Sequence, residues 1–130
     1  MGTRFMASKE SLAPAHTRKV ILETRDGASN TVKATFHDEI RGSLHLWPAL
    51  YDGRAVVGSS YQDHVGGLPL ADNLKKFSDA EAAGDTSRAV TWAGTGVGLV
   101  REELPAADIV TKTRVEARRT IGALQAFAST

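Results

Sequence analysis

Residues 92–100 place three glycines, Gly94, Gly96 and Gly98, at alternate positions behind a tryptophan. Glycine loses more backbone freedom on folding than any other residue and adds no side chain to a core, so this density is costly in an ordinary strand. Such a cost is tolerated where another group must approach the backbone closely. The segment therefore predicts a close neighbour, either a phosphate or flavin group or the packed wall of a larger protein.

The same glycines do not complete a nucleotide-binding motif. A dinucleotide fingerprint that starts at Gly94 needs its third glycine at position 99, which is Leu99. No lysine follows the glycines, as a phosphate-binding loop requires. We therefore interpret the segment as a tight passage of backbone that leads into the last helix of the chain.

Composition indicates a single globular region and excludes several classes of function. The 130 residues are 42% hydrophobic and 24% charged, with a net charge of +1, which favours neither nucleic acid nor an anionic membrane as partner. The chain has no cysteine, which excludes disulfides, thiol catalysis and cysteine-bound metals. No apolar run reaches the ~20 residues of a membrane span, and the first residues lack the apolar core of a signal peptide. We expect a cytoplasmic protein.

Hydrophobic periodicity predicts a mostly helical α+β chain with a minor strand component. Helices are expected near residues 10–25, 70–83 and 105–127, and a strand near 31–37 with Val32, Ala34 and Phe36 on one face. The apolar positions of the last helix recur at three- and four-residue spacing. They are Ile109, Val110, Thr113, Ala117, Ile121, Leu124 and Phe127.

Residues 41–69 show no periodicity, and the predicted strand therefore lacks an obvious partner. A lone strand leaves both of its edges unpaired and fits no common layered architecture. A second strand from residues 55–57 or from residues 89–92 could supply the pairing. A long aperiodic stretch is otherwise functional, or it is evidence against a fold that stands alone.

The candidate chemical groups are few. The histidines His16, His37, His45 and His64 are scattered without metal-ligand spacing, so no metal site is predicted, and each is expected at the surface or in a loop. His37 and Asp38 would point to opposite faces of a strand, so they cannot form a general-base dyad there, and a solvated strand end is expected. Trp47, Tyr51 and Tyr61 line a pocket or form a small satellite core.

Several motifs in a fixed order resemble the C-terminal part of nitronate monooxygenases, formerly called 2-nitropropane dioxygenases. They are Met1-Gly2-Thr3-Arg4-Phe5, Trp47-Pro48 with Tyr51-Asp52-Gly53-Arg54-Ala55, Pro69-Leu70 with Asn73-Leu74, and Trp92-Ala93-Gly94-Thr95-Gly96-Val97-Gly98-Leu99. The resemblance covers nearly the whole chain. It implies an FMN-dependent oxidoreductase, a flavoprotein built on a (β/α)8 barrel with an inserted smaller domain, that oxidises alkyl nitronates with dioxygen.

The resemblance also assigns a place to each part of the chain. Residues 1–30 would be the end of the last barrel strand and the following helix, residues 31–91 a remnant of the inserted domain, and residues 92–130 the glycine-rich return segment with the C-terminal helix. Met1, Gly2 and Thr3 would bind the FMN phosphate once the barrel is complete, as phosphate sites of such barrels follow the last strands. Thr95 stands where related sequences often have glutamine.

The resemblance assigns no catalytic residue to this chain, because the family's histidine base and the other barrel strands lie upstream of the matched region. The isolated chain is expected to be inactive, and a complementary N-terminal barrel chain is a candidate partner. The apolar face with Ile109, Ile121, Leu124 and Phe127 would then stay partly exposed. The alternative interpretation is a non-catalytic remnant or a small protein-binding module.

Overall fold

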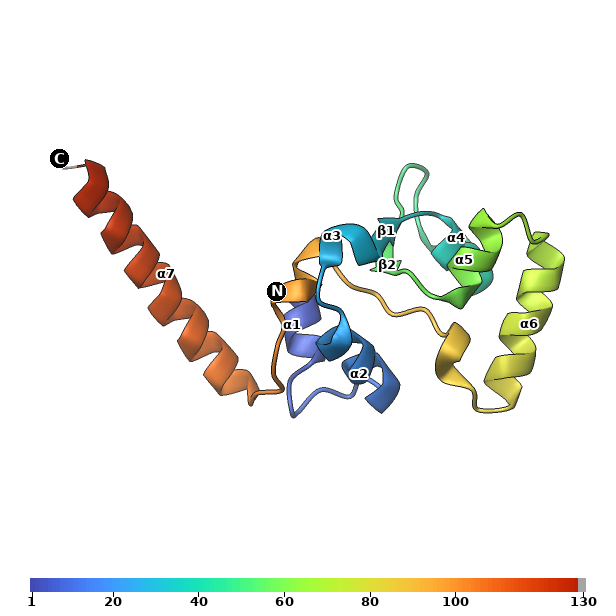
Figure 1. The fold of residues 1–130 in the computed structure, drawn as a ribbon, viewed down its shortest axis with the longest axis horizontal. Coiled ribbons are helices and arrows are strands. Elements are labelled where there is room, and N and C mark those ends of the chain that lie inside the picture. Colours follow the sequence, from blue (N-terminus) through green and yellow to red (C-terminus); the bar gives the residue numbers. More distant parts are fainter. Residues whose placement is uncertain (129–130) are drawn as a thin grey trace.

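The computed structural model describes residues 1–128 and consists mainly of helices (Figure 1). In chain order its elements are α1 (Gly2–Met6), α2 (Ala15–Glu23), α3 (Gly27–Asn30), β1 (Thr31–Lys33), α4 (Phe36–Ile40), the 3-10 helix η1 (Leu44–Leu46), β2 (Arg54–Val56), α5 (Ser59–Val65), α6 (Leu70–Ala82), the 3-10 helices η2 (Thr86–Arg88) and η3 (Thr95–Leu99), and α7 (Ala106–Ala128). The predicted mostly helical class with a minor strand component is confirmed. The predicted segment 92–130 includes residues 129 and 130, which lie outside the described part.

The N-terminal residues form a helix, so the prediction that Met1–Thr3 end a strand is wrong. The first predicted helix is also shorter than residues 10–25, because α2 begins only after Pro14, whose extended backbone precedes the first turn. Before Pro14 the chain forms a turn in which the backbone N–H of Ala13 donates to Ser11 Oγ at 3.1 Å. Side-chain hydrogen bonds of this kind favour turns over helix.

One candidate partner, residues 55–57, pairs with the predicted strand, and the other, residues 89–92, pairs with the first candidate instead. β1 and β2 are antiparallel, with Val32 opposite Ala55, and a further antiparallel bridge joins Ala55 to Trp92. The prediction of a strand over residues 31–37 is too long, because α4 begins at Phe36. The side chains of α4 are buried at Phe36, His37, Asp38 and Ile40.

The aperiodic stretch contains η1, β2 and the helix α5, which the periodicity did not predict. Hydrogen bonds to α6 and η2 help to hold α5 in place. Asn73 of α6, fully buried, donates to the Ser60 carbonyl at 2.8 Å and accepts from Arg88 at 2.9 Å. Arg88 also pairs with Asp63 of α5 at 2.7 Å, so one guanidinium links α5, α6 and η2.

The glycine-rich segment folds as η3 and packs against α3. A Cβ on Gly98 would lie 2.5 Å from the Arg25 carbonyl oxygen, and a Cβ on Gly27 would collide with the Thr95 carbonyl oxygen. The close neighbour that the glycines predict is therefore another part of the same chain. Next to this crossing lies the core cluster of Ala7, Ile21, Ala93, Val97 and Val100.

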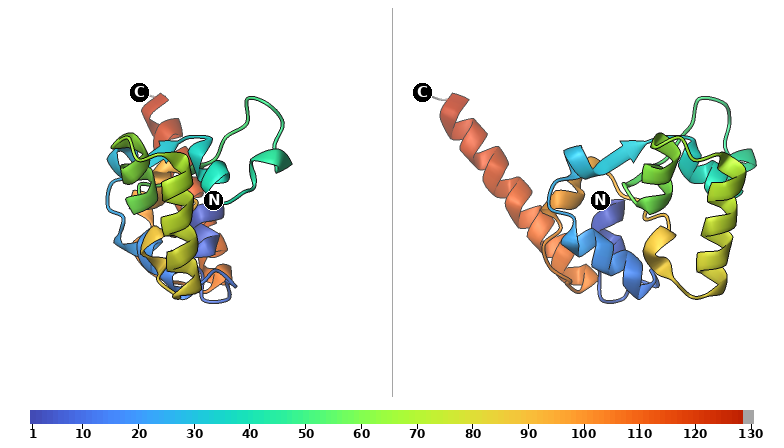
Figure 2. Two further views of the ribbon diagram at one scale, coloured as in Figure 1. Left: turned by 90° about the vertical axis from the view of Figure 1, so that its right-hand side faces the viewer. Right: turned by 45° about the vertical axis from the view of Figure 1, so that its right-hand side comes forward.

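The last helix, α7, leaves the rest of the chain at its first turns and projects away from it (Figure 1, Figure 2). Its start is fixed by the Ala106 N–H, which donates to Glu10 Oε2 at 2.9 Å, and by Ile109, which is 2% exposed. Further along, Ile121 and Leu124 are 55% and 62% exposed. The predicted exposure of the apolar face is confirmed except at Ile109. Within residues 1–128, no helix combines the length and apolarity that crossing a bilayer would need.

Candidate functional site: a groove between α1, η3 and α7

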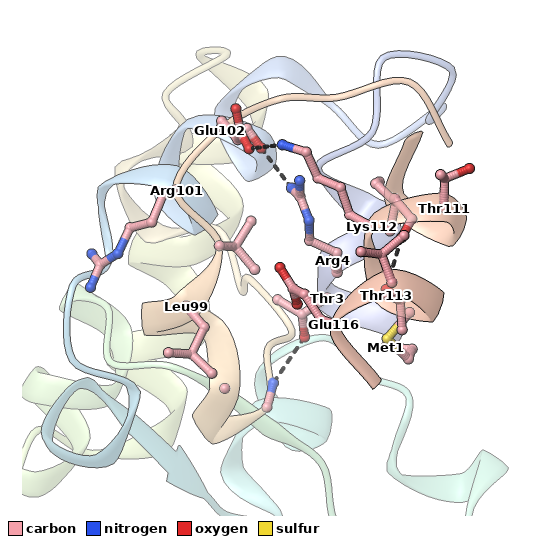
Figure 3. A pocket seen from close by; sticks show the side chains of 15 residues that line it. Met1, Thr3, Arg4, Leu99, Arg101, Glu102, Thr111, Lys112, Thr113 and Glu116 are labelled. Carbon is pink, nitrogen blue, oxygen red and sulfur yellow. Dashed lines mark hydrogen bonds and ion pairs between the residues drawn. The ribbon is translucent and has the colours of Figure 1, made fainter. Parts of the chain in front are cut away.

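A groove of about 790 Å³ lies between α1, η3 and the first turns of α7 (Figure 3). Segments from the two ends of the sequence form it, because a parallel bridge joins Ser8 to Leu104 and brings α1 beside the start of α7. The glycines Gly94 and Gly96 line it, with open space where a Cβ would be. One side of η3 thus packs tightly through Gly98, and the other side leaves its backbone accessible.

Two of the three residues predicted to bind a phosphate, Met1 and Thr3, line this groove. Thr3 Oγ1 accepts a hydrogen bond from the Gly94 N–H at 3.1 Å, so its own hydroxyl hydrogen is left to be donated elsewhere (Figure 3). Gly2 lies between them in α1, and no atom comes within 4 Å of the position that its Cβ would occupy. The structure thus places Met1, Gly2 and Thr3 at the start of a helix beside the glycine-rich segment.

The charged lining of the groove consists of three basic side chains, Arg4, Arg101 and Lys112, and two carboxylates, Glu102 and Glu116. Arg4 donates to the Glu102 carbonyl oxygen at 2.6 Å, and Lys112 of α7 pairs with the Glu102 carboxylate at 2.7 Å (Figure 3). The hydrogen bond from Lys112 and its charge lower the pKa of the Glu102 carboxyl. Arg4 keeps further N–H groups for an anion, since a guanidinium has five. The groove can therefore offer hydrogen-bond donors and positive charge to a phosphate or carboxylate.

None of the four histidines lines this groove. His37, which we interpreted as part of a solvated strand end, is instead buried on α4 with Nε2 3.2 Å from the Val32 carbonyl oxygen. Burial lowers the pKa of this imidazole, while the hydrogen bond to Val32 and the charge of Asp38 oppose the shift. His64 stacks on Phe36 with ring centroids 4.2 Å apart. The surface or loop position predicted for His37 is therefore wrong, whereas His64 is exposed on α5, as predicted.

The aromatic residues predicted as pocket lining or satellite core divide between the two roles. Trp47 and Tyr51 line a second cavity together with Trp92. Tyr61 packs edge-on against Phe36, with ring centroids 5.9 Å apart, in the cluster that also contains His37. The sequence did not predict either group, because each one combines residues that are distant in sequence: Trp47 and Tyr51 with Trp92, and Tyr61 with Phe36.

Comparison with known proteins identifies similar sequences but no structural match. The chain is 52% identical over 129 residues to a protein of Neurospora crassa named nitronate monooxygenase, which covers 99% of this chain. It is 36% identical over 124 residues to nitronate monooxygenase npaC of Metarhizium robertsii, covering 91% of this chain. No family model and no solved structure matches the chain.

This chain spans 34% of the length of each of these two relatives. The similarity nevertheless extends along nearly the whole of this chain. Identity of this extent reflects common descent. The chain is therefore a relative of the nitronate monooxygenases and corresponds to a C-terminal part of them.

Proposed function

We propose that this chain provides the C-terminal part of an FMN-dependent nitronate monooxygenase, which oxidises alkyl nitronates with dioxygen. The observation that carries the proposal is the 52% identity over 129 residues to a protein of that name. The remaining barrel strands and the histidine base would come from the preceding part of the enzyme, on the same or another polypeptide. The chemistry then depends on a surface at which the two parts meet.

The packing within the chain supports the proposed division into barrel and inserted-domain segments. The segments proposed for the barrel, residues 1–30 and 92–130, pack on each other through the contacts of α1, α2 and α3 with η3 and of α1 with α7. The segment proposed for the inserted domain, residues 31–91, carries its own sheet and the helices α4 to α6. An insertion between two neighbouring barrel segments would have this arrangement.

We further propose that Met1, Gly2 and Thr3 hold the phosphate of FMN. The groove fits such a group, because the Thr3 hydroxyl can donate, the backbone at Gly2 is open to close approach, and Arg4 adds positive charge. When bound, FMN supplies the redox chemistry of the oxidation. The residues of this chain would bind and orient it, and Arg4, which donates here to a backbone carbonyl, would balance part of its negative charge.

The exposed apolar face of α7 supports a large covering surface in the complete enzyme. A helix with Ile121 and Leu124 in water lacks the burial that normally stabilises an amphipathic helix. We propose that the N-terminal part of the enzyme packs against this face. The same observation would favour a protein-binding module if the complex formed without flavin.

Reconstitution tests this function. The chain is co-expressed with the N-terminal two-thirds of the Neurospora crassa relative, and the purified complex is examined for flavin absorbance and for oxygen consumption with an alkyl nitronate. We expect a yellow, active complex and a colourless, inactive single chain. A complex that forms without flavin would support the binding-module alternative instead, and a failure of the two parts to associate would contradict the proposal.

The phosphate assignment has its own pair of variants. Gly2→Val places a side chain where the structure has open space, so it should leave the fold intact and yet abolish flavin retention in the complex. The control is Glu81→Lys, a charge reversal at an exposed position on α6. Equal flavin content in the two variant complexes would remove Met1–Thr3 from the site while leaving the enzymatic proposal standing.

A further inference from the structure

A second cavity, of about 240 Å³, lies between α4, the loop that precedes β2, and Trp92. The residues that line it are Asp38, Trp47, Tyr51, Asp52, Gly53 and Trp92. Three of these six residues are aromatic and two are carboxylates. The loop that carries Trp47 and Tyr51 stands out from the body of the molecule in the left view of Figure 2, where it is drawn in teal to green. The cavity is separate from the groove proposed for FMN.

The position of the aromatic wall is specified by close packing. Gly53 lies directly against the six-membered ring of Trp92, and a Cβ there would collide with the ring. His37 meets the same indole edge-on, with centroids 5.9 Å apart. Trp47 is fixed from the other side, because its Nε1–H donates to Asp38 Oδ1 at 3.2 Å. The Trp92 indole is therefore held by packing, and the half-exposed Trp47 indole by its hydrogen bond to Asp38.

Asp38 is a buried carboxylate without a counter-ion among the described residues. Its residue exposure is 2%, and Oδ1 accepts hydrogen bonds only from neutral donors, the Ser43 hydroxyl at 2.8 Å and Trp47 Nε1. Buried charges in proteins are normally paired with an opposite charge. The other carboxylate differs, because Asp52 already pairs with Lys33 at 2.7 Å. The unbalanced negative charge of the cavity is thus that of Asp38.

The aromatic rings favour the same sign of ligand. The face of an indole or phenol ring attracts cations, and in this molecule the Arg41 guanidinium already lies 5.8 Å from the Trp92 ring centroid. Arg41 and Lys33 are nearby positive charges that would repel a cationic ligand, but neither lines the cavity. The volume lies below the ~300–1,000 Å³ of sites for drug-sized ligands, so the cavity suits a small group.

We propose that this cavity binds a small quaternary or methylated ammonium group, with Trp47, Tyr51 and Trp92 as an aromatic cage and Asp38 as its counter-charge. A quaternary ammonium group has no N–H to donate, so it binds to the faces of aromatic rings. The cation–π contacts and a nearby carboxylate then replace the water around the cation. The group can belong to a free small cation or to a methylated lysine side chain, and the experiment has an arm for each.

The chain contains two tryptophans, and both line the cavity, so intrinsic fluorescence reports on it directly. The 130-residue chain is titrated with choline and, separately, with 3,3-dimethylbutan-1-ol, its neutral isostere, at constant ionic strength. We expect saturable quenching by choline and about fivefold or more weaker binding of the alcohol, because the alcohol loses the cation–π contacts. Equal binding of the two molecules would overturn the proposal.

A second titration uses a short peptide with one trimethyllysine and the same peptide with leucine in its place. Binding of the trimethyllysine peptide more tightly than choline would assign the ammonium group to a protein side chain, and the reverse order would assign it to a free cation. If neither choline nor the trimethyllysine peptide changes the fluorescence, the cavity is not a site for such groups.

Variants separate the charge from the rings. Tyr51 is 64% exposed, so Tyr51→Leu should preserve the fold and weaken choline binding at least about fivefold, while Tyr51→Phe retains the ring face and the affinity. Asp38→Asn should weaken binding of choline but leave binding of the neutral alcohol unchanged. Far-ultraviolet circular dichroism verifies folding of each variant. Unchanged choline affinity in Tyr51→Leu would contradict the cage.

Discussion

The crossing of η3 over α3 is tightly packed, whereas α7 is packed against the rest of the chain only at its first turns. At the crossing, two backbones come so close that neither Gly27 nor Gly98 has room for a Cβ. Along α7, burial ends soon after Ile109, and the apolar face continues into solvent. The first region is complete within this chain. The helix α7 has the apolar face of a helix that packs on a core, but beyond Ile109 no such core covers it among the described residues.

The contrast between the η3–α3 crossing and α7 separates residues whose close packing is explained by neighbours within this chain from residues that lack such neighbours in its described part. Among the glycines of residues 92–100, Gly98 is explained by neighbours that are present, Arg25 and Gly27, whereas Gly94 and Gly96 face the open groove. The hydrophobic periodicity of α7 is not explained by any described neighbour beyond its first turns. Variants in the two regions should accordingly behave very differently.

The largest effect is expected at the crossing. Gly98→Val forces a branched side chain into the Arg25 carbonyl, and we expect the free energy of unfolding to fall by about 3 kcal/mol or more, since the clash is with backbone. Gly96→Ala is the matched control on the same 3-10 helix, because its Cβ would meet open space. Urea denaturation followed by tryptophan fluorescence measures both. Similar midpoints for the two variants would mean that η3 and α3 do not cross as described.

The next effect compares two isoleucines of α7. Ile109→Ala removes a side chain that is buried against the body, and we expect a loss of about 3 kcal/mol in unfolding free energy. Ile121→Ala, on the exposed continuation of the helix, should change it by less than about 0.5 kcal/mol in the isolated chain. If Ile121→Ala proves as costly as Ile109→Ala, the far part of α7 packs on the body in solution and the comparison fails.

A smaller, pH-dependent effect is expected from His37 in the packed body. Burial lowers the pKa of His37 below its ordinary value of 6.5, so the unfolded chain takes up this proton more readily than the folded chain. Stability should therefore be constant above that value and decrease as the pH falls below it, until the lowered pKa of the folded state is passed. The charge of Asp38 opposes this shift, a charge on His64 adds to it, and the Tyr61 ring packs against the imidazole.

Denaturation curves at half-unit steps between pH 8 and pH 5 measure this dependence. The control is His37→Gln, whose amide can donate to the Val32 carbonyl but does not titrate. The wild-type chain should lose stability relative to this variant as the pH falls. Parallel profiles of the two proteins would show that His37 keeps an ordinary pKa and is not buried as described.

The smallest effect is expected at the start of α7. Glu10→Ala removes the carboxylate that accepts the Ala106 N–H, and loss of a side-chain cap costs about 0.5–1 kcal/mol. Faster hydrogen exchange of the first amides of α7, without a change at the η3 crossing, would sharpen the distinction between the two regions. Glu103→Ala provides a neighbouring exposed carboxylate as control. Equal exchange in both variants would show that Glu10 does not anchor the helix.

Long helices were the part of the fold that the sequence predicted well. α6 and α7 match residues 70–83 and 105–127 within a few residues, because their apolar positions recur over several turns. Short elements were predicted poorly. Phe36 looked like the end of an alternating strand, but it begins α4. The helix α5 was missed because hydrogen bonds donated by Asn73 and Arg88 support it.

The sequence predicted which residues belong to the candidate site better than it predicted how they are arranged. Resemblance to a family indicated Met1 to Thr3 and the glycine-rich segment separately, and the structure brings Thr3 and Gly94 into hydrogen-bond contact. The helical conformation of residues 2–6 was not predictable from five residues. The environment of Asp38 was equally hidden, because its partners Ser43 and Trp47 depend on the course of an aperiodic loop.

Because α7 is attached only at its first turns, a small rotation there moves the far end of the helix by a large distance. At 1.5 Å per residue its 23 residues extend about 34 Å, so a rotation of about 10° at the root would displace the far end by about 6 Å. The Lys112–Glu102 ion pair and the Glu10 cap both act near that root. Small adjustments where the proposed cofactor groove lies would thus be amplified at the distant apolar tip, and the aim of the whole helix is set within its first two turns.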